Sequence, residues 1–546
     1  MPEAMDGNSI GGLLIDVFGA DMTAASSTCG TCGAVRPVAE LVVYRQAPGT
    51  VVRCRTCDSV LMVFIQAHGL ICVDLSGLAS LGQPELALAR NTEGMNMSIE
   101  ESPSMQPSER QNMSQGQMQP AGGQVQEPQA QMTQAPQGHM MQGGHLYIQT
   151  NEIRNCIIHY YRAPDGTITE AGRILTGGAG SGTYKPISGQ ESAPNAFEGA
   201  NSVILTPDRR FLFATNGGDN SVSSFAVSTD GKLTLLDAKR TGNVVDGRSG
   251  TAKALAYSPA HSTLFVLHAF GPDHLRLMSV DEEGNLTALP EGYTVNTPDK
   301  PNRVGTMAAL TADEKFLVVG TTFDEPAKAN PDGSPILWVE KNGVPHSVAS
   351  NAPDPDGLIV FPVGAHGSLG EAKLQDGGGG SPWNVQFLHQ RPDYFVLGYA
   401  VGEGLALGRI NEDGDLDIGP ITQVGTFGGK PTELCWISLT PDDRLAFATN
   451  FGYGYISSYR IDSNVLSIAN DPACPKVPGD GTFRALNGTV SSGASDNWIS
   501  PTGSHFYQIY PNASKLAGYA IQSDGSLEEI TSAAIPYQSP QGVTGF

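Results

Sequence analysis

The sequence predicts an all-β protein: a seven-bladed β-propeller that carries an N-terminal zinc ribbon on a disordered linker. Three observations predict this organisation. A strand-turn-strand motif recurs over residues 146–546, two Cys-X-X-Cys pairs stand within residues 1–90, and residues 91–145 are mainly Met, Gln, Pro, Ser and Gly. The composition agrees, because 66 glycines and a charged share of only 16% favour short strands joined by glycine turns over helices with charged faces.

The N-terminal segment, residues 1–90, has the pattern of a zinc ribbon. Its two cysteine pairs are separated by 21 residues and read Cys29-Gly-Thr-Cys32 and Cys54-Arg-Thr-Cys57. A Cys-X-X-Cys turn directs two thiolates at one point, and two such turns on adjacent hairpins complete a tetrahedral sulfur site. Because cysteine fills all four positions, the spacing predicts a structural Zn²⁺ with no open position for catalysis. Two redox disulfides or four free thiols are the alternatives.

Apolar runs around the cysteines predict the elements that hold them. Leu41–Tyr44 and Val60–Phe64 have the length and composition of strands. Ahead of the first pair, a set of apolar residues falls on one helical face and predicts a short helix: Ile10, Leu13, Leu14, Val17 and Phe18.

Residues 5–80 resemble a family of short, uncharacterised bacterial zinc-ribbon proteins. The resemblance rests on the two cysteine pairs and on Met5-Asp-Gly-Asn8, Gly11-Gly-Leu-Leu14 and Leu70-Ile-Cys-Val-Asp-Leu75. It implies a fold and a metal, and zinc ribbons in general bind nucleic acid or protein. With 5 basic and 8 acidic residues in 1–90, this segment favours a protein partner.

The second segment, residues 91–145, has the composition of a linker. It contains no aromatic residue and only isolated aliphatic ones. Such a stretch cannot bury enough apolar area to offset the entropy lost on ordering, so we expect it to be flexible and disordered.

Residues 146–546 contain an internal repeat. Thr206–Asn216 reads TPDRRFLFATN and returns as TPDDRLAFATN in Thr440–Asn450. Each copy predicts a strand, a turn and a second strand, which a third strand and a hairpin then follow. Looser copies begin at Ser258-Pro, Thr311-Ala-Asp, Gln390-Arg-Pro-Asp and Ser500-Pro-Thr-Gly.

Seven hairpin turns predict seven four-stranded blades. Residues that tolerate positive φ mark these turns, as two-residue hairpins require. The last strand, Gln541–Phe546, is expected to join the blade that Leu146–Thr150 begins, which closes the ring and removes exposed sheet edges. One long interval holds an insertion at about 324–356 that should lie over one face. The turn markers are Asp165-Gly166, Asp230-Gly231, Glu283-Gly284, His366-Gly367, Asp413-Gly414, Ser463-Asn464 and Asp524-Gly525.

These repeats resemble the lactonase-type seven-bladed propellers, the group that includes the bacterial propeller form of 6-phosphogluconolactonase. The resemblance is clearest in Cys435–Asp442 with Ala448-Thr-Asn450 and Ile456–Tyr459, and in Asn220–Phe225. It implies a hydrolase that opens a sugar lactone or a related cyclic ester. In that family, histidines stand five or six residues before the proline of the strand-turn motif in two blades; here no equivalent position is histidine.

Polar residues at the starts of the innermost strands are the candidate site, because propeller ligands usually meet that end of the central channel. Glu433 or Asp496 would be the general base that activates water, and Lys253 would stabilise the oxyanion. Asn201, Asn384 and Asn497 would bind substrate through hydrogen bonds. A divalent cation held by oxygen ligands would need at least two converging carboxylates. The remaining alternative is that these groups satisfy one another and water.

Charge and cysteine content restrict the partners and the compartment. The 32 basic and 55 acidic residues give a net charge of -23, which predicts repulsion from nucleic acid and from anionic membrane. Acidic residues near the N-terminus do not fit a signal peptide, and 8 cysteines are too few for a disulfide scaffold, so we expect a cytoplasmic protein. The expected partner is a small lactone or sugar, or a protein. The alternative function is a catalytically silent propeller that serves as a binding platform for proteins or ligands.

Overall fold

The structure is a computed structural model that divides into two units, Met1–Gln137 and Gly138–Phe546. It describes residues 5–18, 22–46, 49–67, 70–82, 143–182, 200–243, 251–298, 300, 303–322, 357–400, 402–424, 432–481, 490–537 and 539–546, with the backbone of 328–329, 335–336, 338–341 and 344–347. The expected linker lies almost entirely outside the described residues. Within the described part, no helix is long and apolar enough to cross a membrane.

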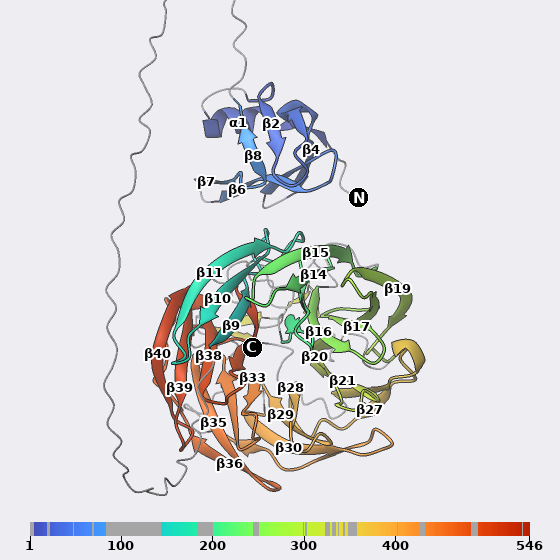
Figure 1. The fold of residues 1–546 in the computed structure, drawn as a ribbon, viewed down its shortest axis with the longest axis vertical. Helices are drawn as coiled ribbons and strands as arrows, with labels where there is room; N and C mark the ends of the chain where they lie inside the picture. Colours follow the sequence, from blue (N-terminus) through green and yellow to red (C-terminus); the bar gives the residue numbers. More distant parts are fainter. Residues whose placement is uncertain are drawn as a thin grey trace, which may run out of the picture. The chain divides into compact units, whose positions relative to one another are not determined.

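The N-terminal unit consists of two small sheets and a short helix (Figure 1). The larger sheet has the order β1-β4-β5-β6-β7, and the smaller has the order β3-β2-β8. The helix that the apolar spacing predicts is α1 (Gly11–Phe18), preceded by the 3₁₀ turn η1 (Gly7–Ile10). The strands are β1 (Met5–Asp6), β2 (Ser26–Cys29), β3 (Val35–Pro37), β4 (Val42–Gln46), β5 (Gly49–Arg53), β6 (Val60–Ala67), β7 (Leu70–Asp74) and β8 (Leu78–Leu81).

A single apolar core joins the helix of this unit to its larger sheet. Ile10 and Leu14 are fully buried and pack with Val43 of β4 and Phe64 of β6. Cys29 and Cys54 belong to the same core, so the first cysteine of each pair is fixed by apolar packing.

The second unit contains seven antiparallel sheets, each with a run of four strands, which Figure 1 shows arranged in a ring. We number them as blades along the chain and give the innermost strand first. Blade 1 is β41 (Gln541–Gly545), β9 (Gly144–Gln149), β10 (Cys156–Arg162) and β11 (Ile168–Leu175). Blade 2 is β12 (Val203–Leu205), β13 (Phe211–Asn216), β14 (Ser221–Val227) and β15 (Leu233–Arg240). Blade 3 is β16 (Ala252–Ser258), β17 (Thr263–His268), β18 (Leu275–Val280) and β19 (Leu286–Tyr293).

Blades 4 to 7 complete the ring in chain order. Blade 4 is β20 (Val304–Leu310), β21 (Phe316–Thr322), β26 (Leu358–Pro362) and β27 (Lys373–Gln375). Blade 5 is β28 (Pro382–Phe387), β29 (Tyr394–Tyr399), β30 (Gly404–Ile410) and β31 (Leu416–Ile418), and β32 (Thr422–Gln423) also pairs with β30. Blade 6 is β33 (Leu434–Leu439), β34 (Leu445–Asn450), β35 (Tyr455–Asp462) and β36 (Val465–Asn470). Blade 7 is β37 (Asn497–Ile499), β38 (His505–Tyr510), β39 (Lys515–Ile521) and β40 (Leu527–Ala534).

The insertion falls between the second and third strands of blade 4. Its described parts are two hairpins, β22 (Lys328–Ala329) with β23 (Pro335–Ile336), and β24 (Trp338–Lys341) with β25 (Val344–Ser347). The rest of the insertion, and with it the face that it would cover, lies outside the described residues.

The two ends of the propeller segment share blade 1, as the sequence predicts. β41 pairs antiparallel with β9, and Gln541 stands opposite Gln149. Each innermost strand contacts the next around the ring, and β41 contacts both β37 of blade 7 and β12 of blade 2. The ring is therefore closed by hydrogen bonds between the first and last strands of the segment.

Each predicted hairpin turn is held by a polar side chain from the preceding blade. Tyr507 of blade 7 donates its hydroxyl to the Gly166 carbonyl in the turn of blade 1, at 2.7 Å. Side chains from six more blades hold the remaining turns in the same way, so the turn residues also join neighbouring blades. The contacts are Tyr147 with Gly231, Ser224 with Gly284, Thr263 with His366, Lys373 with Asp413, Arg391 with Asn464, and Asn470 with Asp524.

Innermost strands are bulged close to their starts in five blades. In β16, for example, Ala252 and Ala254 stand opposite adjacent residues of β17, and Lys253 is the extra residue between them. A bulge bends its strand and redirects the extra side chain. In the other four bulged strands, the extra residues near the strand start are Thr306, Trp383, the Cys435–Trp436 pair and Gly542. We call the face at which the innermost strands begin the entry face.

Candidate functional site

The two cysteine pairs of the N-terminal unit lie on turns with the same backbone hydrogen bonds. In the first turn, the Cys29 amide donates to the Ala34 carbonyl and the Gly33 amide donates to the Cys29 carbonyl. In the second turn, the Cys54 amide donates to the Ser59 carbonyl and the Asp58 amide donates to the Cys54 carbonyl. Gly33 and Asp58 both have positive φ, 69° and 60°, so a left-handed residue closes each turn.

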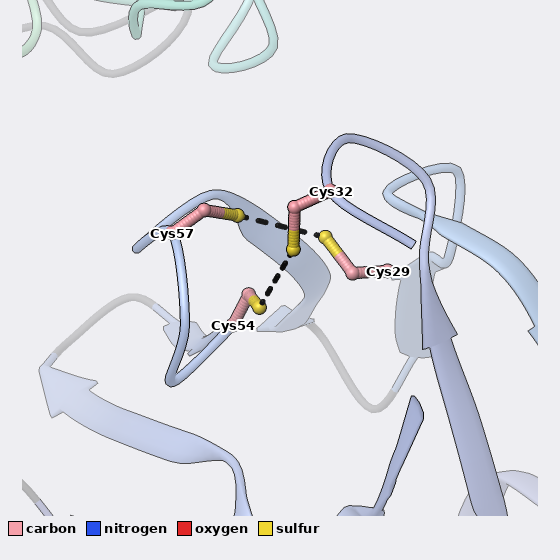
Figure 2. Close-up of side chains that lie close together, drawn as sticks. All are labelled: Cys29, Cys32, Cys54 and Cys57. Atoms are coloured by element: carbon pink, nitrogen blue, oxygen red, sulfur yellow. Dashed lines mark hydrogen bonds between the residues drawn. The ribbon is translucent and has the colours of Figure 1, made fainter. Parts of the chain in front are cut away.

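The four thiols converge on one point, as Figure 2 shows. The Sγ atoms of Cys29 and Cys57 are 3.7 Å apart, and those of Cys32 and Cys54 are also 3.7 Å apart. All four Sγ atoms lie within 4.8 Å of one another. A tetrahedral zinc with bonds of about 2.3 Å needs sulfur atoms about 3.8 Å apart, whereas a disulfide needs about 2.05 Å. The spacing therefore suits a shared metal ion better than two disulfides.

This candidate metal centre is half buried and closed. Cys29 and Cys54 are 2% and 1% exposed, while Cys32 and Cys57 are exposed. The Thr56 amide donates to the Cys54 sulfur at 3.4 Å, a contact that would stabilise a metal-bound thiolate. With four protein ligands no coordination position is left for a substrate, so an ion here would be structural. Within the described residues, no other group of three or more His, Cys, Asp or Glu side chains could hold a metal.

All six predicted residues of the propeller lie at the entry face. Lys253, Asn384 and Asn497 are in the innermost strands β16, β28 and β37. Glu433 and Asp496 directly precede β33 and β37. Asn201 stands two residues before β12. Five of them are buried, and Asn201 is half-buried.

Lys253 brings three blades together. Its Nζ lies 5.4 Å from the centroid of the Trp383 ring, across from blade 3 to blade 5. Trp383 in turn meets Trp436 of blade 6 edge to face, with ring centroids 6.2 Å apart. Lys253 is only 1% exposed, and a desolvated cation over an aromatic face is stabilised by about 2 kcal/mol.

Glu433 belongs to the same neighbourhood. Cys435, two residues further along, donates its thiol to the Glu433 carbonyl at 3.2 Å. Burial raises the pKa of this thiol far above its usual range, and the charges of Glu433 and Lys253 act on it in opposite directions. Glu433 has a positive φ of 53°, a strained conformation of the kind that concentrates at functional sites. Glu433 and Lys253 therefore both lie near enough to Cys435 for their charges to act on its thiol.

Asp496 has a different environment. Its Oδ1 accepts the Asn497 amide at 2.9 Å and its Oδ2 accepts the Val543 amide of β41 at 3.1 Å. Burial raises the pKa of this carboxyl to about 8, although the two amides act against that rise. Asp496 therefore holds a proton at neutral pH and links blade 7 to the closing strand of blade 1.

The three predicted asparagines are not brought into one cluster. Ser438 of blade 6 donates its hydroxyl to the Asn497 carboxamide oxygen. Asn384 accepts a bond from Gln386 Nε2 at 3.2 Å. Asn201 accepts the Leu255 amide through its backbone carbonyl at 3.0 Å and has a positive φ of 61°.

Several buried residues of the entry face were not selected by sequence reasoning. Trp383 lies against Lys253 and Trp436 lies against Trp383, both at bulges of their strands that no pattern in the sequence marks. The sequence did offer one reason to select Gln541, because it begins the strand that is expected to close the ring. Gln149 stands opposite Gln541, and the neighbouring Ser202 follows Asn201.

Histidines are absent from the described innermost strands. His268, at the end of β17, is fully buried and its Nε2 lies 2.9 Å from the Thr241 hydroxyl. Burial lowers its pKa to about 3, so it is neutral. His145 and His159 form a pair in blade 1, with Nδ1 and Nε2 2.9 Å apart, away from the entry face.

Together these features define a closed, seven-bladed propeller with a charged and aromatic entry face, fused to a small four-cysteine domain. Residues 1–85 match a family of unknown function, DUF6510. No curated protein matches the chain.

The propeller is similar to solved lactonase propellers. The periplasmic gluconolactonase PpgL of Pseudomonas aeruginosa has a TM-score of 0.51 at 14% identity, covering 74% of this chain and 99% of its own. A putative 6-phosphogluconolactonase from Bacteroides fragilis has a TM-score of 0.50 at 14% identity, and the match covers 76% of this chain and 100% of the other. A second putative 6-phosphogluconolactonase, from Bacteroides uniformis, has a TM-score of 0.51 at 13% identity, and the match covers 74% of this chain and 99% of the other. At these identities the likeness shows the fold alone, a closed β-propeller.

Proposed function

We propose that the propeller hydrolyses a sugar lactone, such as 6-phosphogluconolactone or a related cyclic ester, at its entry face. The observation that carries this proposal is that Lys253 lies over the Trp383 ring, and that the charges of Lys253 and Glu433 both act on the Cys435 thiol. It supplies a carboxylate, a cation and an aromatic face within one buried neighbourhood. These are the groups that hydrolysis of a cyclic ester of a sugar requires.

In this proposal Glu433 acts as the general base. It takes a proton from water, the water oxygen attacks the lactone carbonyl carbon, and negative charge develops on the carbonyl oxygen. The Lys253 ammonium group stabilises that oxyanion. The bond from the carbonyl carbon to the ring oxygen then breaks, and the ring oxygen receives a proton, which gives a hydroxy acid.

Asp496 suits the second proton transfer. Because its pKa is raised to about 8, it is protonated at neutral pH and is a donor to the leaving ring oxygen rather than a base. Asn201, Asn384 and Asn497 would bind substrate hydroxyls. The aromatic faces of Trp383 and Trp436 would contact the apolar face of the sugar ring.

The test of this site is Lys253→Met, measured as turnover of 6-phosphogluconolactone and of simple aldonolactones. Loss of one oxyanion partner should lower kcat by about 10²–10³-fold. Lys232→Met is the matched control, since Lys232 lies exposed in a hairpin turn. Equal turnover in both variants and the wild type would refute the role of Lys253.

A binding platform is the second candidate, and the placement of the histidines favours it. None of the histidines described in the propeller lies on an innermost strand. A propeller without catalytic groups would instead present its entry face to a protein or small molecule. Failure of the wild-type chain to hydrolyse any tested lactone would support this reading.

For the N-terminal unit we propose a structural zinc ion, a protein partner and a reducing, cytoplasmic location. Four zinc-bound thiolates persist best where cysteines are kept reduced. Arg53, beside the second cysteine pair, is already engaged by Asp58, with Nη1 2.9 Å from the Asp58 carbonyl oxygen. The unit also has more acidic than basic residues, which favours a protein partner. Cross-linking followed by mass spectrometry would identify the partner as protein or nucleic acid.

A further inference from the structure

Four blades share one type of turn between their first and second strands. In blade 6 the Thr440 amide donates to the Leu445 carbonyl, and the Asp443 amide donates to the Thr440 carbonyl. Blades 2, 4 and 7 repeat these two bonds, and in each blade the residue equivalent to Asp443 has positive φ. The equivalent residues are Arg209, Glu314 and Gly503, with φ of 60°, 57° and 70°. Because these turns follow the innermost strands, they lie on the face opposite the entry face.

A carboxylate at this position holds the preceding blade in two cases. Glu314 of blade 4 accepts the Ser258 hydroxyl and the Ala260 amide, both from blade 3. Asp443 of blade 6 accepts two backbone amides of blade 5 at 2.9 and 2.6 Å, those of His389 and Gln390. In blades 4 and 6 the side chain therefore fills the junction with its neighbour.

Blade 7 has no side chain at the equivalent position. In blade 2 the position is taken by Arg209, whose guanidinium lies 5.1 Å from the centroid of the Phe546 ring beside blade 1. In blade 7 it is taken by Gly503. A β-carbon added to Gly503 would lie 3.1 Å from Cδ of Pro441 in blade 6, so a side chain there would also reach the preceding blade.

A cavity of about 350 Å³ lies at this junction between blades 6 and 7. Gly503 and Pro441 line it, and its charged lining residues are Asp442, Arg444 and Arg460. Small-molecule sites in proteins begin at about 300 Å³, so the cavity has room for a small ligand or for one side chain. The junction lacks the carboxylate that two other blades supply, and it has the space for one.

The charges around the cavity favour an anion. Asp442 is already engaged, because its Oδ1 accepts the Thr440 hydroxyl at 2.7 Å and its Oδ2 lies 3.1 Å from Arg444 Nε. Arg460 has no side-chain hydrogen bond or ion pair with any described residue. Its charge acts on Asp524 of the next hairpin, but the two groups form no ion pair. The lining therefore has one positive charge more than negative, in a chain with a net charge of -23.

The kind of anion follows from the same groups. A guanidinium binds a carboxylate through two parallel hydrogen bonds, and carboxylates fill the equivalent junctions of blades 4 and 6. A doubly charged phosphate would be repelled more strongly by Asp442 than a singly charged carboxylate would.

We propose that the cavity between blades 6 and 7 binds a carboxylate group from outside the chain, carried by a free dicarboxylic acid or by the side chain of an acidic peptide. Arg460 pairs with the carboxylate, which occupies the space that a side chain at Gly503 would fill. The site lies away from the entry face, so it does not depend on the proposed lactonase function.

Calorimetry on the full chain tests the site with two probes, glutarate and the peptide acetyl-Gly-Glu-Gly-amide. We expect at least one probe to bind the wild type at millimolar concentration, and the tighter probe identifies the source of the carboxylate. Arg460→Gln should weaken binding about tenfold or more, because a hydrogen bond to a charged group is lost. Arg240→Gln, at an exposed arginine of β15, is the matched control and should bind as the wild type does.

A second variant supplies the missing group from within the chain. Gly503→Asp places a carboxylate at the position that Asp443 occupies in blade 6, where aspartate has a similar φ of 57°. We expect this variant to lose binding of the probes. It should also unfold at a higher temperature than Gly503→Asn, which has the same shape and no charge. Thermal unfolding of every variant checks that the propeller remains folded.

Four results would overturn the proposal. The first is a wild type that binds neither probe at millimolar concentration. The second is equal binding by the wild type and by folded Arg460→Gln or Gly503→Asp. The third is inorganic phosphate that binds as tightly as the better probe, which would show a general attraction of anions. The fourth is an equal unfolding temperature for Gly503→Asp and Gly503→Asn, which would show that a carboxylate gains nothing at this junction.

Discussion

Asp496 shows how position in the fold changes the chemistry of a single carboxyl group. Both of its oxygens accept backbone amides, one from its own strand and one from the closing strand. These bonds favour the charged form, yet complete burial outweighs them and raises the pKa to about 8. An aspartate at the mouth of a propeller would ordinarily be taken as a base, whereas this one holds its proton at neutral pH.

This shift predicts a pH dependence of stability. An unfolded aspartate ionises near pH 4, so between about pH 4 and pH 8 the folded chain binds one more proton than the unfolded chain. The free energy of unfolding should therefore fall as pH rises through this window, by at most about 1.4 kcal/mol per pH unit from this group. Urea unfolding at pH 5–8 measures the slope.

Asp496→Asn should flatten that slope, because asparagine does not titrate. The control is Asp165→Asn in a surface turn, where hydrogen bonds from Thr167 lower the pKa and titration falls below the window. The same slope in the wild type and in Asp496→Asn would contradict this assignment.

The four cysteines make a second prediction at the residue scale. Purified full chain should contain one zinc ion per chain, and Cys54→Ser should remove it, because three remaining thiolates bind far more weakly. Since binding free energy at such a site is folding free energy, a strong chelator should also unfold the N-terminal unit. Elemental analysis and circular dichroism measure the two effects.

The control is Cys156→Ser, in β10 of the propeller. A chain with this substitution should keep the zinc ion of the N-terminal unit. The metal assignment would be wrong if the wild-type chain, purified without chelators, contained no zinc, or if Cys54→Ser retained a full equivalent.

At the scale of elements, the hairpin turns connect the blades. In each of the seven blades, a side chain from the preceding blade holds the turn between the third and fourth strands. The expected two-residue hairpins are wrong at these Gly turns: Ala163 bonds to Thr167, and Ser228 to Lys232, around loops of three residues. In such a loop the last residue has positive φ, as at Gly166 and Gly231, with φ of 86° and 76°. The same geometry exposes a carbonyl oxygen toward the neighbouring blade, where Tyr507 or Tyr147 donates to it.

Tyr507→Phe removes one such bond and leaves the Gly166 carbonyl buried without its donor. We expect the propeller to lose about 1 kcal/mol of unfolding free energy, the usual net value of one hydrogen bond. Tyr161→Phe is the control, because Tyr161 is 47% exposed on β10. Equal unfolding midpoints in urea for both variants would show that the turn contact contributes nothing.

The turns and strand pairs could be predicted from sequence because local chemistry determines them. Glycine and aspartate mark positive φ, and alternating apolar residues mark strands, so the seven blades and the pairing of Gln541–Phe546 with the start of the propeller are confirmed. The four-cysteine cluster could be predicted for the same reason, since each pair is a local turn.

The composition of the entry face could be predicted only in part. Lys253 is the second residue of β16 and Glu433 directly precedes β33, so both stand at the starts of innermost strands. The contact of Lys253 with Trp383 depends on bulges in two strands from different blades, and a one-residue bulge has no sequence signature. Gln149 is paired with a residue almost four hundred positions away, Gln541, and Gly542 forms a bulge in that strand.

At the scale of the whole molecule, the propeller depends on a single closure. β41 supplies the innermost strand of blade 1 and donates its Val543 amide to Asp496 of blade 7. It also contacts β12 of blade 2, so it joins three blades. Without it, β9 would become an exposed edge with unpaired backbone groups, which favours aggregation.

A chain that ends before Gln541 tests this closure. We expect a lower thermal midpoint, by well over 10 °C, and concentration-dependent aggregation in light scattering, because the ring loses a strand and the contacts between three blades. Thr544→Ser, in the same strand, controls for a change in β41 that keeps the pairing. A truncated chain as stable and monodisperse as the wild type would show that closure is not the main constraint.

The central claim, that this entry face hydrolyses a sugar lactone, is tested most directly by acid release from glucono-1,5-lactone. The rate is followed with a pH indicator for the wild-type full chain and for Glu433→Gln. The account predicts saturable hydrolysis above the spontaneous rate, reduced about 10²–10⁴-fold by loss of the general base. A wild-type rate equal to that of buffer, or a Glu433→Gln rate equal to that of the wild type, would contradict it.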